Sequence, residues 1–462
     1  MPMSLPIRFH SFALSLLIFL GLLPGTIRAE PPILDAKAAI LARIKVPEFA
    51  TRDFTISDHG AAPGGDCTEA IARAIAACHE AGGGRVVVPP GVWRTGAVHL
   101  KSNVNLHLTE GATLRFDSGP AKFLPVVLTR FEGIECMNFS PLIYAFSQEN
   151  IAITGQGTLD GSANWETWWA WNDKSKGTTK QTPDRKRLDQ QGTDGTPIAA
   201  RIYGDGHFLR PNFIQPYRCK NVLIEGVTIL NSPMWEIHPV LCTNVTVRGV
   251  SVRSLGTNND GCDPESCRDV LIEDCIFETG DDCIAIKSGR NNDGRRIGVA
   301  SENIVIRRCT MKDGHGGVTM GSEISGGVRN VFVEDCKMDS PNLERAFRFK
   351  SNAVRGGVIE DIFIRNVEIG RVKRAVLSVE FDYEEGAHGP HKPVLRNVRI
   401  ENVTTKSAGR VSAITSFPGA VIEGVLLKDC AFRGVEAPDV IKDASPPTLQ
   451  NVTIERAKKE KQ

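Results

Sequence analysis

The heptapeptide NIVIRRC at residues 303–309 is one copy of a phrase that recurs along the C-terminal half of the chain. Each copy opens with a polar or small residue, here called the anchor, and has apolar residues at its second, fourth and seventh positions. This alternation is typical of a strand, because side chains on a strand point to opposite faces in turn. The anchors are residues 221, 244, 269, 303, 330, 361, 397, 424 and 451.

The spacing of these copies favours a solenoid. Successive anchors lie 23 to 36 residues apart, and strands repeated at such a period bury their inner faces by stacking on one another. Leucine-rich repeats have a similar period, but their Leu and Asn consensus is absent here. We therefore expect an all-β, single-domain parallel β-helix.

Seven of the twelve cysteines follow the register of the phrase. Equivalent positions in stacked turns of a β-helix lie about 4.8 Å apart, so we expect these seven to be reduced, apolar core residues. Four occupy the seventh position and three lie two residues before an anchor: Cys275, Cys309, Cys336, Cys430, and Cys219, Cys242, Cys267. The remaining five are open to pairing: Cys67, Cys78, Cys136, Cys262 and Cys283.

The N-terminal region lacks the repeated phrase and has a different sequence pattern. Residues 1–29 combine a basic start, an apolar run of about 12 residues and a small residue before a cleavage site, which is typical of a signal peptide and too short for a membrane span. We expect a secreted or periplasmic protein. Within residues 30–120, a helix capped by Asp66 or Thr68 and running to about Glu80, followed by strands, suits a cap over the open end of the solenoid. The catalytic β-helix would then occupy residues 121–462.

Residues 161–211 interrupt the rhythm and contain four of the six tryptophans. We interpret this segment as a long loop beside the solenoid rather than a further domain. Its tryptophans either form a small core that holds the loop together or stack on sugar rings. Such a loop could close one end of a substrate cleft. In an enzyme that acts on a polymer, this would favour cleavage from the end of the polymer chain.

The formal net charge is +1. This value excludes the strong basic field of a nucleic-acid binder and any global attraction to an acidic polymer. An acidic substrate would have to be held by local cations.

Four charged or glycine-rich motifs in successive turns are not explained by packing. They are Asn258-Asn259-Asp260, Gly280-Asp281-Asp282, Gly314-His315-Gly316 and Arg348-Phe349-Lys350, at similar offsets from their anchors. Stacking of the turns would gather them on one face. Carboxylates held close together raise one another's pKa, so one can stay protonated as an acid while its partners polarise water, as glycosidases require. Asp263 either faces the same cleft or completes a turn.

In these four motifs and their order, the sequence resembles glycoside hydrolase family 28, the polygalacturonases. The family's signatures are Asn-Thr-Asp, Gly-Asp-Asp, Gly-His-Gly and Arg-Ile-Lys; here Asn259 replaces Thr and Phe349 replaces Ile. The resemblance runs from about Phe54 to the C-terminus. It implies a right-handed, pectin-lyase-like parallel β-helix and hydrolysis of α-1,4-galacturonosidic bonds with inversion, for which acid and base stand roughly 6.5 to 9.5 Å apart.

The resemblance also implies a role for each catalytic residue. Asp282 would be the general acid that protonates the glycosidic oxygen. Asp260 and Asp281 would activate the hydrolytic water, and His315 would tune the protonation of the acid. No metal or other cofactor is implied.

Substrate contacts are implied for five further residues. Arg348 and Lys350 would hold a galacturonate carboxylate, with Asn258 and Gly316 beside them. His238 lies one turn before the first aspartate in a segment that resembles bacterial members of the family near the substrate, and it is equally interpretable as a structural histidine.

Two rival functions remain open. A pectate lyase shares the fold and the substrate but eliminates rather than hydrolyses, usually with calcium; a carbohydrate-binding solenoid would have no activity. Rhamnogalacturonan and xylogalacturonan are alternative polymers. The expected partner is therefore a pectic polysaccharide or oligogalacturonide, with no nucleic acid and no membrane, bound by a monomer.

Overall fold

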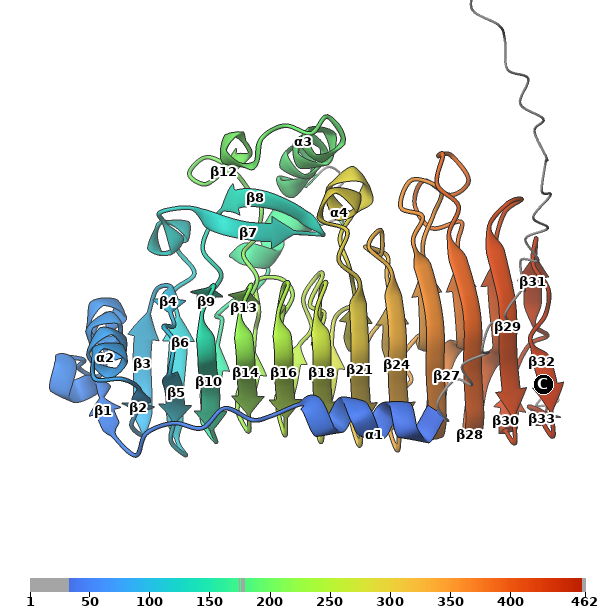
Figure 1. Ribbon diagram of the computed structural model, residues 1–462, viewed down its shortest axis with the longest axis horizontal. Helices are drawn as coiled ribbons and strands as arrows, with labels where there is room; N and C mark the ends of the chain where they lie inside the picture. The colour runs from blue at the N-terminus through green and yellow to red at the C-terminus, as the bar shows by residue number, and fades with distance from the viewer. Residues whose placement is uncertain (1–32, 174, 176–178, 459–462) are drawn as a thin grey trace, which may run out of the picture.

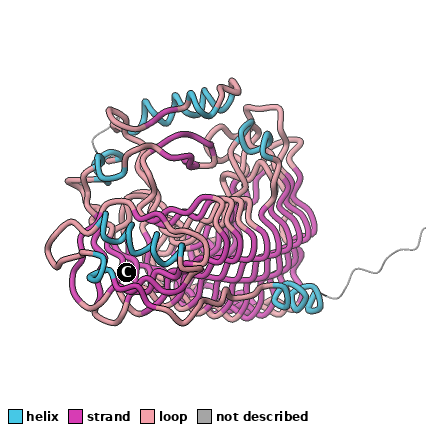
Figure 2. Tube along the Cα trace, turned by 60° about the vertical axis from the view of Figure 1, so that its left-hand side comes forward, coloured by secondary structure: helices cyan, strands magenta, loops and turns pink. Residues whose placement is uncertain are grey.

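The computed structural model describes residues 33–173, 175 and 179–458, and the expected signal peptide lies outside them. The chain forms a parallel β-helix whose turns, called coils here, stack along one long axis (Figures 1 and 2). Each coil contributes to up to three parallel sheets, and β27 (Val358–Glu380) and β28 (Val394–Thr415) run through all three. The predicted fold class is confirmed.

The first sheet contains the repeated phrase. Its strands, besides β27 and β28, are β1 (Asp53–Thr55), β2 (Gly84–Val88), β5 (Val104–Leu108), β10 (Glu149–Gly155), β14 (Lys220–Glu225), β16 (Thr243–Arg248), β18 (Arg268–Glu273), β21 (Ser301–Arg307), β24 (Val328–Glu334), β29 (Val421–Lys428) and β32 (Thr448–Gln450).

The second sheet lies beyond the next corner of each coil. Its strands are β3 (Gly91–Thr95), β6 (Ala112–Phe116), β11 (Thr158–Asp160), β15 (Thr228–Leu230), β17 (Ser251–Ser254), β19 (Ile276–Thr279), β22 (Thr310–Met311), β25 (Lys337–Met338), β30 (Ala431–Val435) and β33 (Thr453–Arg456).

The third sheet is the one that carries the charged motifs. Its strands are β4 (Val98–His99), β9 (Ile143–Phe146), β13 (Ile214–Tyr217), β20 (Ile284–Ile286), β23 (Val318–Met320), β26 (Arg345–Lys350) and β31 (Val440–Lys442). Isolated bridges at Ile237 and Cys262 continue it between β13 and β20.

The phrase stays in register from coil to coil. Its second position pairs in an unbroken row through Val222, Val245, Val270, Ile304, Val331, Ile362, Val398 and Val425. The inward positions are buried in one continuous core. The repeat therefore predicted the strand pairing as well as the strands.

The anchors turn the chain into the first sheet. All eight from residue 221 to residue 424 adopt the left-handed conformation, with φ between +53° and +63°. Asn, Asp and Gly tolerate this conformation best, which explains the residue types found there. The amides also form a ladder: Asn244 donates to Asn221 at 2.7 Å, and Asn330 to Asn303 at 3.2 Å.

The ninth copy was placed in the wrong register. Thr448 pairs with Leu426, whereas Asn451 lies beside Asp429, donating to its carboxylate at 2.7 Å. Asp429 forms a second left-handed corner, five residues after the anchor Gly424. Because both corners favour Asn, Asp or Gly, the sequence of a terminal coil does not distinguish them.

All twelve cysteines are free and buried, as expected for the seven in register. The three that lie two residues before an anchor stack at successive coils: the amide of Cys219 lies 3.4 Å from the sulfur of Cys242, and that of Cys242 lies 3.4 Å from the sulfur of Cys267. The five cysteines left open are therefore also unpaired.

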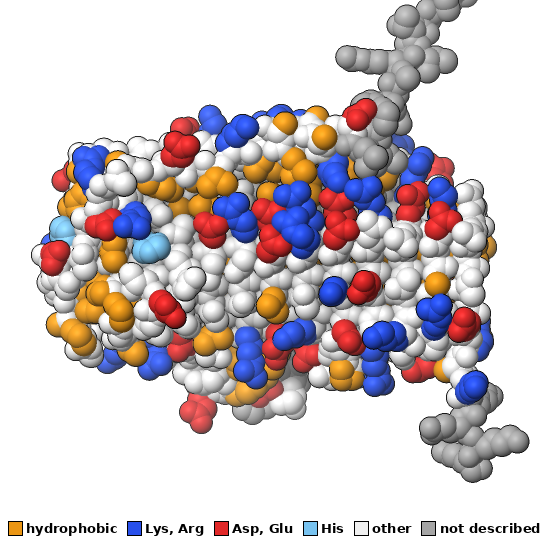
Figure 3. Space-filling view, turned by 90° about the horizontal axis from the view of Figure 1, so that it is seen from below, with side chains coloured by type: hydrophobic (Ala, Val, Ile, Leu, Met, Phe, Trp, Pro, Cys, Tyr) orange, Lys and Arg blue, Asp and Glu red, His pale blue; other side chains and the backbone are white. Residues whose placement is uncertain are grey.

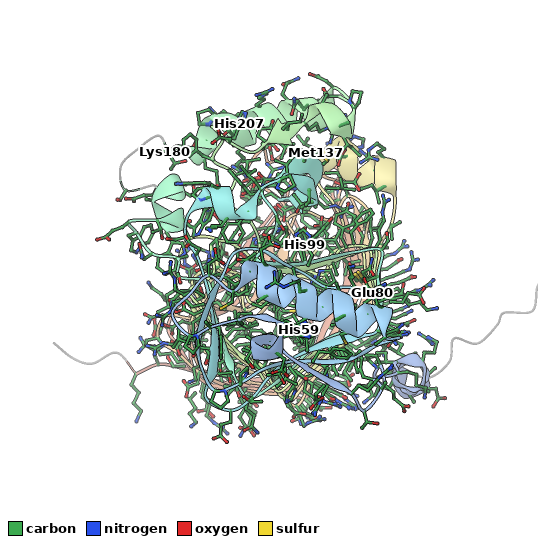
Figure 4. The ribbon with its side chains drawn as sticks, turned by 90° about the vertical axis from the view of Figure 1, so that its left-hand side faces the viewer. His59, Glu80, His99, Met137, Lys180 and His207 are labelled. Atoms are coloured by element: carbon green, nitrogen blue, oxygen red, sulfur yellow. The ribbon has the colours of Figure 1, made fainter. Side chains whose placement is uncertain are left out.

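Two N-terminal helices cover the solenoid. The expected helix is α2 (Thr68–Glu80), which lies across the end of the coils (Figure 4) and buries Ile71 and Ile75 against them. The helix α1 (Ile33–Arg43) was not expected; it runs along the first sheet (Figure 1) over outward apolar residues that include Val305 and Phe332.

A superstructure rises above the third sheet. The antiparallel hairpin of β7 (Val127–Phe131) and β8 (Ile134–Asn138) pairs with β12 (Ile202–Tyr203), and α3 (Gln181–Thr193) and α4 (Asn291–Ile297) lie beside it (Figures 1 and 2). Short 3₁₀ turns complete the fold: η1 (Ile56–His59), η2 (Pro120–Phe123), η3 (Trp168–Asn172) and η5 (Ile198–Ala200).

The expected long loop at residues 161–211 is therefore partly helical. Trp168 is buried, its ring centroid 4.7 Å from that of Trp171 and 5.7 Å from that of Phe123, so the tryptophans form a small core. Trp165 is half exposed. No helix among the described residues is long and apolar enough to cross a membrane.

Candidate active site

A cleft of about 370 Å³ lies over the central coils of the third sheet. Six of the predicted site residues line it: Asn258, Asp260, Asp281, His315, Arg348 and Lys350. Three do not: Asp282, Gly316 and His238. The cleft is thus where stacking was expected to gather the four motifs.

Strand register brings the motifs together. Cys262 bridges to Ile284, Ile284 pairs with Val318, and Val318 pairs with Phe347. These apolar side chains point into the core, so their neighbours point outward. The pairing of Cys262 with Ile284 places Asp260 and Asp282, each two residues earlier, in adjacent coils, and Gly261 N donates to Asp282 O at 3.0 Å.

The three aspartates converge closely. One carboxylate oxygen from each of Asp260, Asp281 and Asp282 lies within 4.8 Å of the others. This is tighter than the 6.5 to 9.5 Å expected between the acid and base of an inverting enzyme, so that expectation is wrong for the oxygens of this trio. Burial, together with Asp263 and Asp281, raises the pKa of Asp260 well above its ordinary value.

Asp282 is fully buried beneath the cleft and is paired with two cations. Lys350 Nζ lies 2.7 Å from Asp282 Oδ2, and Arg348 lies 3.5 Å from Oδ1. Burial opposes ionisation, but the two cations outweigh it and hold the pKa of Asp282 well below its ordinary value. These two contacts favour the carboxylate form of Asp282, whereas the role of general acid expected for it needs the protonated form. That role stays a prediction, without support from the geometry.

Asp281 is the aspartate that reaches the cleft beside the histidine. Its side chain is 17% exposed, and its Oδ1 lies 2.8 Å from His315 Nδ1. Burial opposes ionisation, yet the hydrogen bond with His315 lowers the pKa of Asp281, and the same bond raises that of His315. The imidazole therefore hydrogen-bonds Asp281, whereas Asp282 acts on it only through its charge.

The glycines of the third motif permit this crowding. A Cβ on Gly316 would lie 2.8 Å from Asp282 Oδ1, and one on Gly314 would lie 2.4 Å from the carbonyl oxygen of Asp281. Gly316, expected beside the substrate, instead gives room to the buried carboxylate.

The first motif is anchored by its two amides. Asn258 has a φ of +56° and accepts hydrogen bonds from Arg210 at 2.7 Å and Asn172 at 2.8 Å. Asn259, which stands where the family has Thr, is fully buried and bonds four backbone or side-chain groups, among them Ser232 O at 3.1 Å. The side chain of Asn259 therefore holds in place the loop that carries Asp260.

His238 is not a cleft residue, and the expectation that it contacts substrate is corrected. It is fully buried, with Nε2 2.8 Å from Glu265 and Nδ1 2.9 Å from Gln215. Burial lowers its pKa despite the bond to Glu265. The histidine holds the hairpin onto the third sheet, because Arg130 of β7 lies 3.0 Å from the same glutamate.

Lys287 is a cleft residue that sequence reasoning missed. Its amine lies 3.6 Å from Asp260 and 3.7 Å from Asp263, and 4.3 Å from the ring centroid of Trp235. A signal existed: Lys287 follows the alternating Ile284-Ala285-Ile286, which predicts that it points outward beside the aspartates. Asp263, fully buried, faces this lysine below the cleft.

A wall of ionic contacts closes one side of the cleft. Arg185 of α3 lies 2.5 Å from Glu132, in the turn between β7 and β8, and 3.0 Å from Glu384, which follows β27. Arg290 contacts the same two acids at 3.2 and 3.5 Å. These residues come from distant parts of the chain, so no local pattern could have predicted the wall.

The aspartate trio is, within the described ranges, the one group of side chains whose ligand atoms converge enough to hold a metal ion. Lys350 and Arg348 already contact both oxygens of Asp282. A metal ion would have to displace these cations, so the contacts disfavour such a role.

Comparison with known proteins adds independent findings. Residues 185–437 match the Glycosyl hydrolases family 28. The chain is 42% identical to the hyperthermoactive exopolygalacturonase from Thermotoga maritima, covering 92% of this chain and 96% of that one with a TM-score of 0.88.

Two further relatives are named for opposite modes of attack. The Exo-poly-alpha-D-galacturonosidase of Dickeya chrysanthemi is 26% identical over 87% of this chain and 70% of its own length. The Endo-polygalacturonase of Pectobacterium carotovorum subsp. carotovorum is 26% identical over 82% of this chain and 89% of its own length.

Proposed function

The chain belongs to glycoside hydrolase family 28, and from this premise we propose that it hydrolyses the α-1,4-galacturonosidic bonds of polygalacturonate or oligogalacturonides from the chain end. The observation that carries the proposal is the trio of aspartates at the base of a cleft that is lined by cations. Carboxylates supply the acid and base of glycoside hydrolysis, and the cations suit an acidic sugar.

We propose Asp281 as the general acid. Of the three aspartates it is the most exposed to the cleft, and its contact with His315 gives the pair one transferable proton. A neutral Asp281 would protonate the glycosidic oxygen as the bond to the anomeric carbon breaks. His315 would then supply the next proton.

Asp260 and Asp282 would activate the attacking water. Asp282 is kept ionised by Lys350, and Lys287 lies 3.6 Å from Asp260. Water held between such carboxylates becomes a better nucleophile because its proton has an acceptor ready. The raised pKa of Asp260 makes it the alternative acid, which a leaving-group test separates from Asp281.

Arg348 and Lys350 would still hold a substrate carboxylate. Both line the cleft, although Arg348 also forms a two-point contact with Glu380 at 2.7 and 3.2 Å. Arg345, Arg374 and Arg185 add positive charge to the rim. The same lining includes as many acids as cations, among them Glu344 and Glu384, so we propose that individual cations, and not a net positive field, hold the acidic sugar.

Attack on the chain end follows from the wall. Arg185, Glu132 and Glu384 line the cleft and join α3 and the hairpin to the loop after β27, and we propose that this wall stops a polymer from extending past it. The sugar that reaches the wall would be the terminal one.

We propose that the enzyme is a monomer exported from the cytoplasm and that inversion is the stereochemical outcome. The support for inversion is the family, since the spacing of the trio is shorter than the usual rule requires. Nuclear magnetic resonance of the first anomer released in a short incubation tests it.

One set of assays tests the activity. Purified protein incubated with polygalacturonate should release reducing sugar with galacturonate monomer as the early product, and should do so in EDTA. Growth of ultraviolet absorbance from an unsaturated product would show elimination, and the absence of any new reducing ends would leave a binding protein. Parallel incubations with rhamnogalacturonan and xylogalacturonan identify the preferred polymer.

A further inference from the structure

A second hollow, of about 410 Å³, opens beside the cleft over the C-terminal coils. The two cavities share Arg345 and Arg374, so the hollow continues the cleft. Its lining includes small residues of successive coils, Ala375, Ser378 and Ala413. Ser378 pairs with Ala413 in the third sheet, and such steps along the axis are about 4.8 Å.

Cations without acidic partners border this hollow. Lys373 and Arg410 both line it, and in the described part of the chain neither side chain contacts an acid. Arg374 is 57% exposed at its side chain and shares Glu344 with Arg345. The lining of the hollow therefore has more basic than acidic side chains, the acids being Glu380 and Glu436.

The opposite side of the molecule differs. There, basic and acidic side chains lie next to each other in the space-filling view from below (Figure 3). Cations of one coil commonly pair with acids of the neighbouring coil, as Arg365 does with Glu334 at 2.7 Å and Arg396 with Glu360 at 2.6 Å. Lys373 and Arg410 thus differ from these cations, which are neutralised by an acid of the neighbouring coil.

The two directions along the axis are also unequal. Toward the N-terminal coils the third sheet is covered by the hairpin, where Thr129 bonds Gln215 at 2.5 Å and Arg130 lies 3.0 Å from Glu265. Toward the C-terminal coils the hollow stays open, and Figure 1 shows no helix above these coils on that side among the described residues. The hollow is thus an open continuation of the cleft toward the C-terminal coils.

We propose that the hollow, together with Lys373, Arg374 and Arg410, binds the part of an acidic polysaccharide that extends beyond the released sugar. This inference rests on the proposed function and adds to it a site for an anionic chain outside the catalytic cleft. The ligand class is an oligouronate, whose sugars each carry one carboxylate and follow one another along the axis on which the coils stack. Longer oligomers should therefore bind more tightly than a dimer.

The test compares the double variant Lys373→Gln/Arg410→Gln with the parent on digalacturonate and hexagalacturonate. We expect kcat/KM for hexagalacturonate to fall roughly tenfold, because two exposed charge contacts are lost, with digalacturonate within about twofold. The loss should shrink in high salt, which screens exposed charges. The control is Lys337→Gln/Arg399→Gln, since both residues are exposed on other sheets.

Binding of hexagalacturonate, measured by titration calorimetry, separates this inference from the proposed function. Equal losses on both substrates, or no loss on either, would overturn the inference while leaving hydrolysis intact. A parent that binds through Lys373 and Arg410 yet releases no reducing sugar would sustain the inference and refute the proposed hydrolysis. A parent that neither binds nor hydrolyses would refute both.

Discussion

Lys350 Nζ lies 2.7 Å from Asp282 Oδ2, and both side chains are almost completely buried, Lys350 in the lining of the cleft and Asp282 beneath it. A buried charge without a partner is far less stable than a buried pair. The same contact that favours the ionised form of Asp282 therefore also stabilises the fold around it.

The first prediction follows from this pair. Lys350→Met should destabilise the protein by about 3 kcal/mol, because it leaves Asp282 buried with only the more distant Arg348. The double variant Lys350→Met/Asp282→Asn should recover most of this loss, since no unpaired charge remains. Thermal melting of the parent, both single variants and the double variant measures the coupling. Additive losses would show that the two side chains act independently.

A second prediction separates the acid from the water-activating aspartates. Asp281→Asn should lower kcat/KM on digalacturonate by at least about 10³-fold, but by less than about tenfold on a galacturonide with a 4-nitrophenyl leaving group, which needs little protonation. Asp260→Asn and Asp282→Asn should lose activity on both substrates. Should Asp260→Asn, rather than Asp281→Asn, be the variant spared on the activated substrate, the roles must be exchanged.

The pH profile gives a third prediction. The pair of Asp281 and His315 must hold a proton, and the raised pKa of His315 keeps it there as the pH rises beyond the ordinary histidine value of about 6.5. Activity should then fall as the pH rises through this raised pKa. In His315→Asn the proton resides on a carboxyl alone, so the basic limb of kcat/KM should move toward lower pH. An unchanged limb would remove His315 from the proton transfer.

The wall provides a fourth prediction. Arg185→Ala/Glu384→Ala removes three of its four ionic contacts and leaves that of Arg290 with Glu132, and the opened cleft should release a spread of oligomers from polygalacturonate alongside monomer. Lys186→Ala, an exposed neighbour on α3, is the control and should leave the products unchanged. Chromatographic sizing of early products reads the outcome. Monomer alone from the double variant would place the end of the cleft elsewhere.

The sequence predicted the parts of the molecule that repeat. Strand pairing, the buried cysteines and the meeting of Asp260 with Asp282 all follow from one register, because equivalent positions in stacked coils must lie together. The same logic failed at Asn451, where two corners have the same residue preference.

Side-chain roles within the site were less predictable. Sequence spacing placed Asp281 and Asp282 in one motif but could not show that the former contacts His315 and the latter Lys350. His238 was ambiguous for a related reason. Whether a residue that points outward from the sheet is exposed to solvent depends on the hairpin above it, which comes from a distant segment.

The left-handed anchors support a last prediction that concerns the fold alone. Asn303 has a φ of +60°, and its amide bonds Asp269 at 3.2 Å. Asn303→Gly and Asn303→Ala both lose the side-chain bonds, but only alanine is strained by the left-handed conformation. We expect the glycine variant to be the more stable of the two by about 1 kcal/mol, the reverse of the usual order.

Lys337, which lies in strand β25 and is not among the left-handed residues, supplies the control. There the alanine variant should be more stable than the glycine variant, because glycine loses more backbone entropy on folding. A long solenoid need not unfold in two states, so the order of the melting temperatures within each pair is the quantity to compare. The same order at both positions would mean that Asn303 is selected for its hydrogen bonds and not for its backbone conformation.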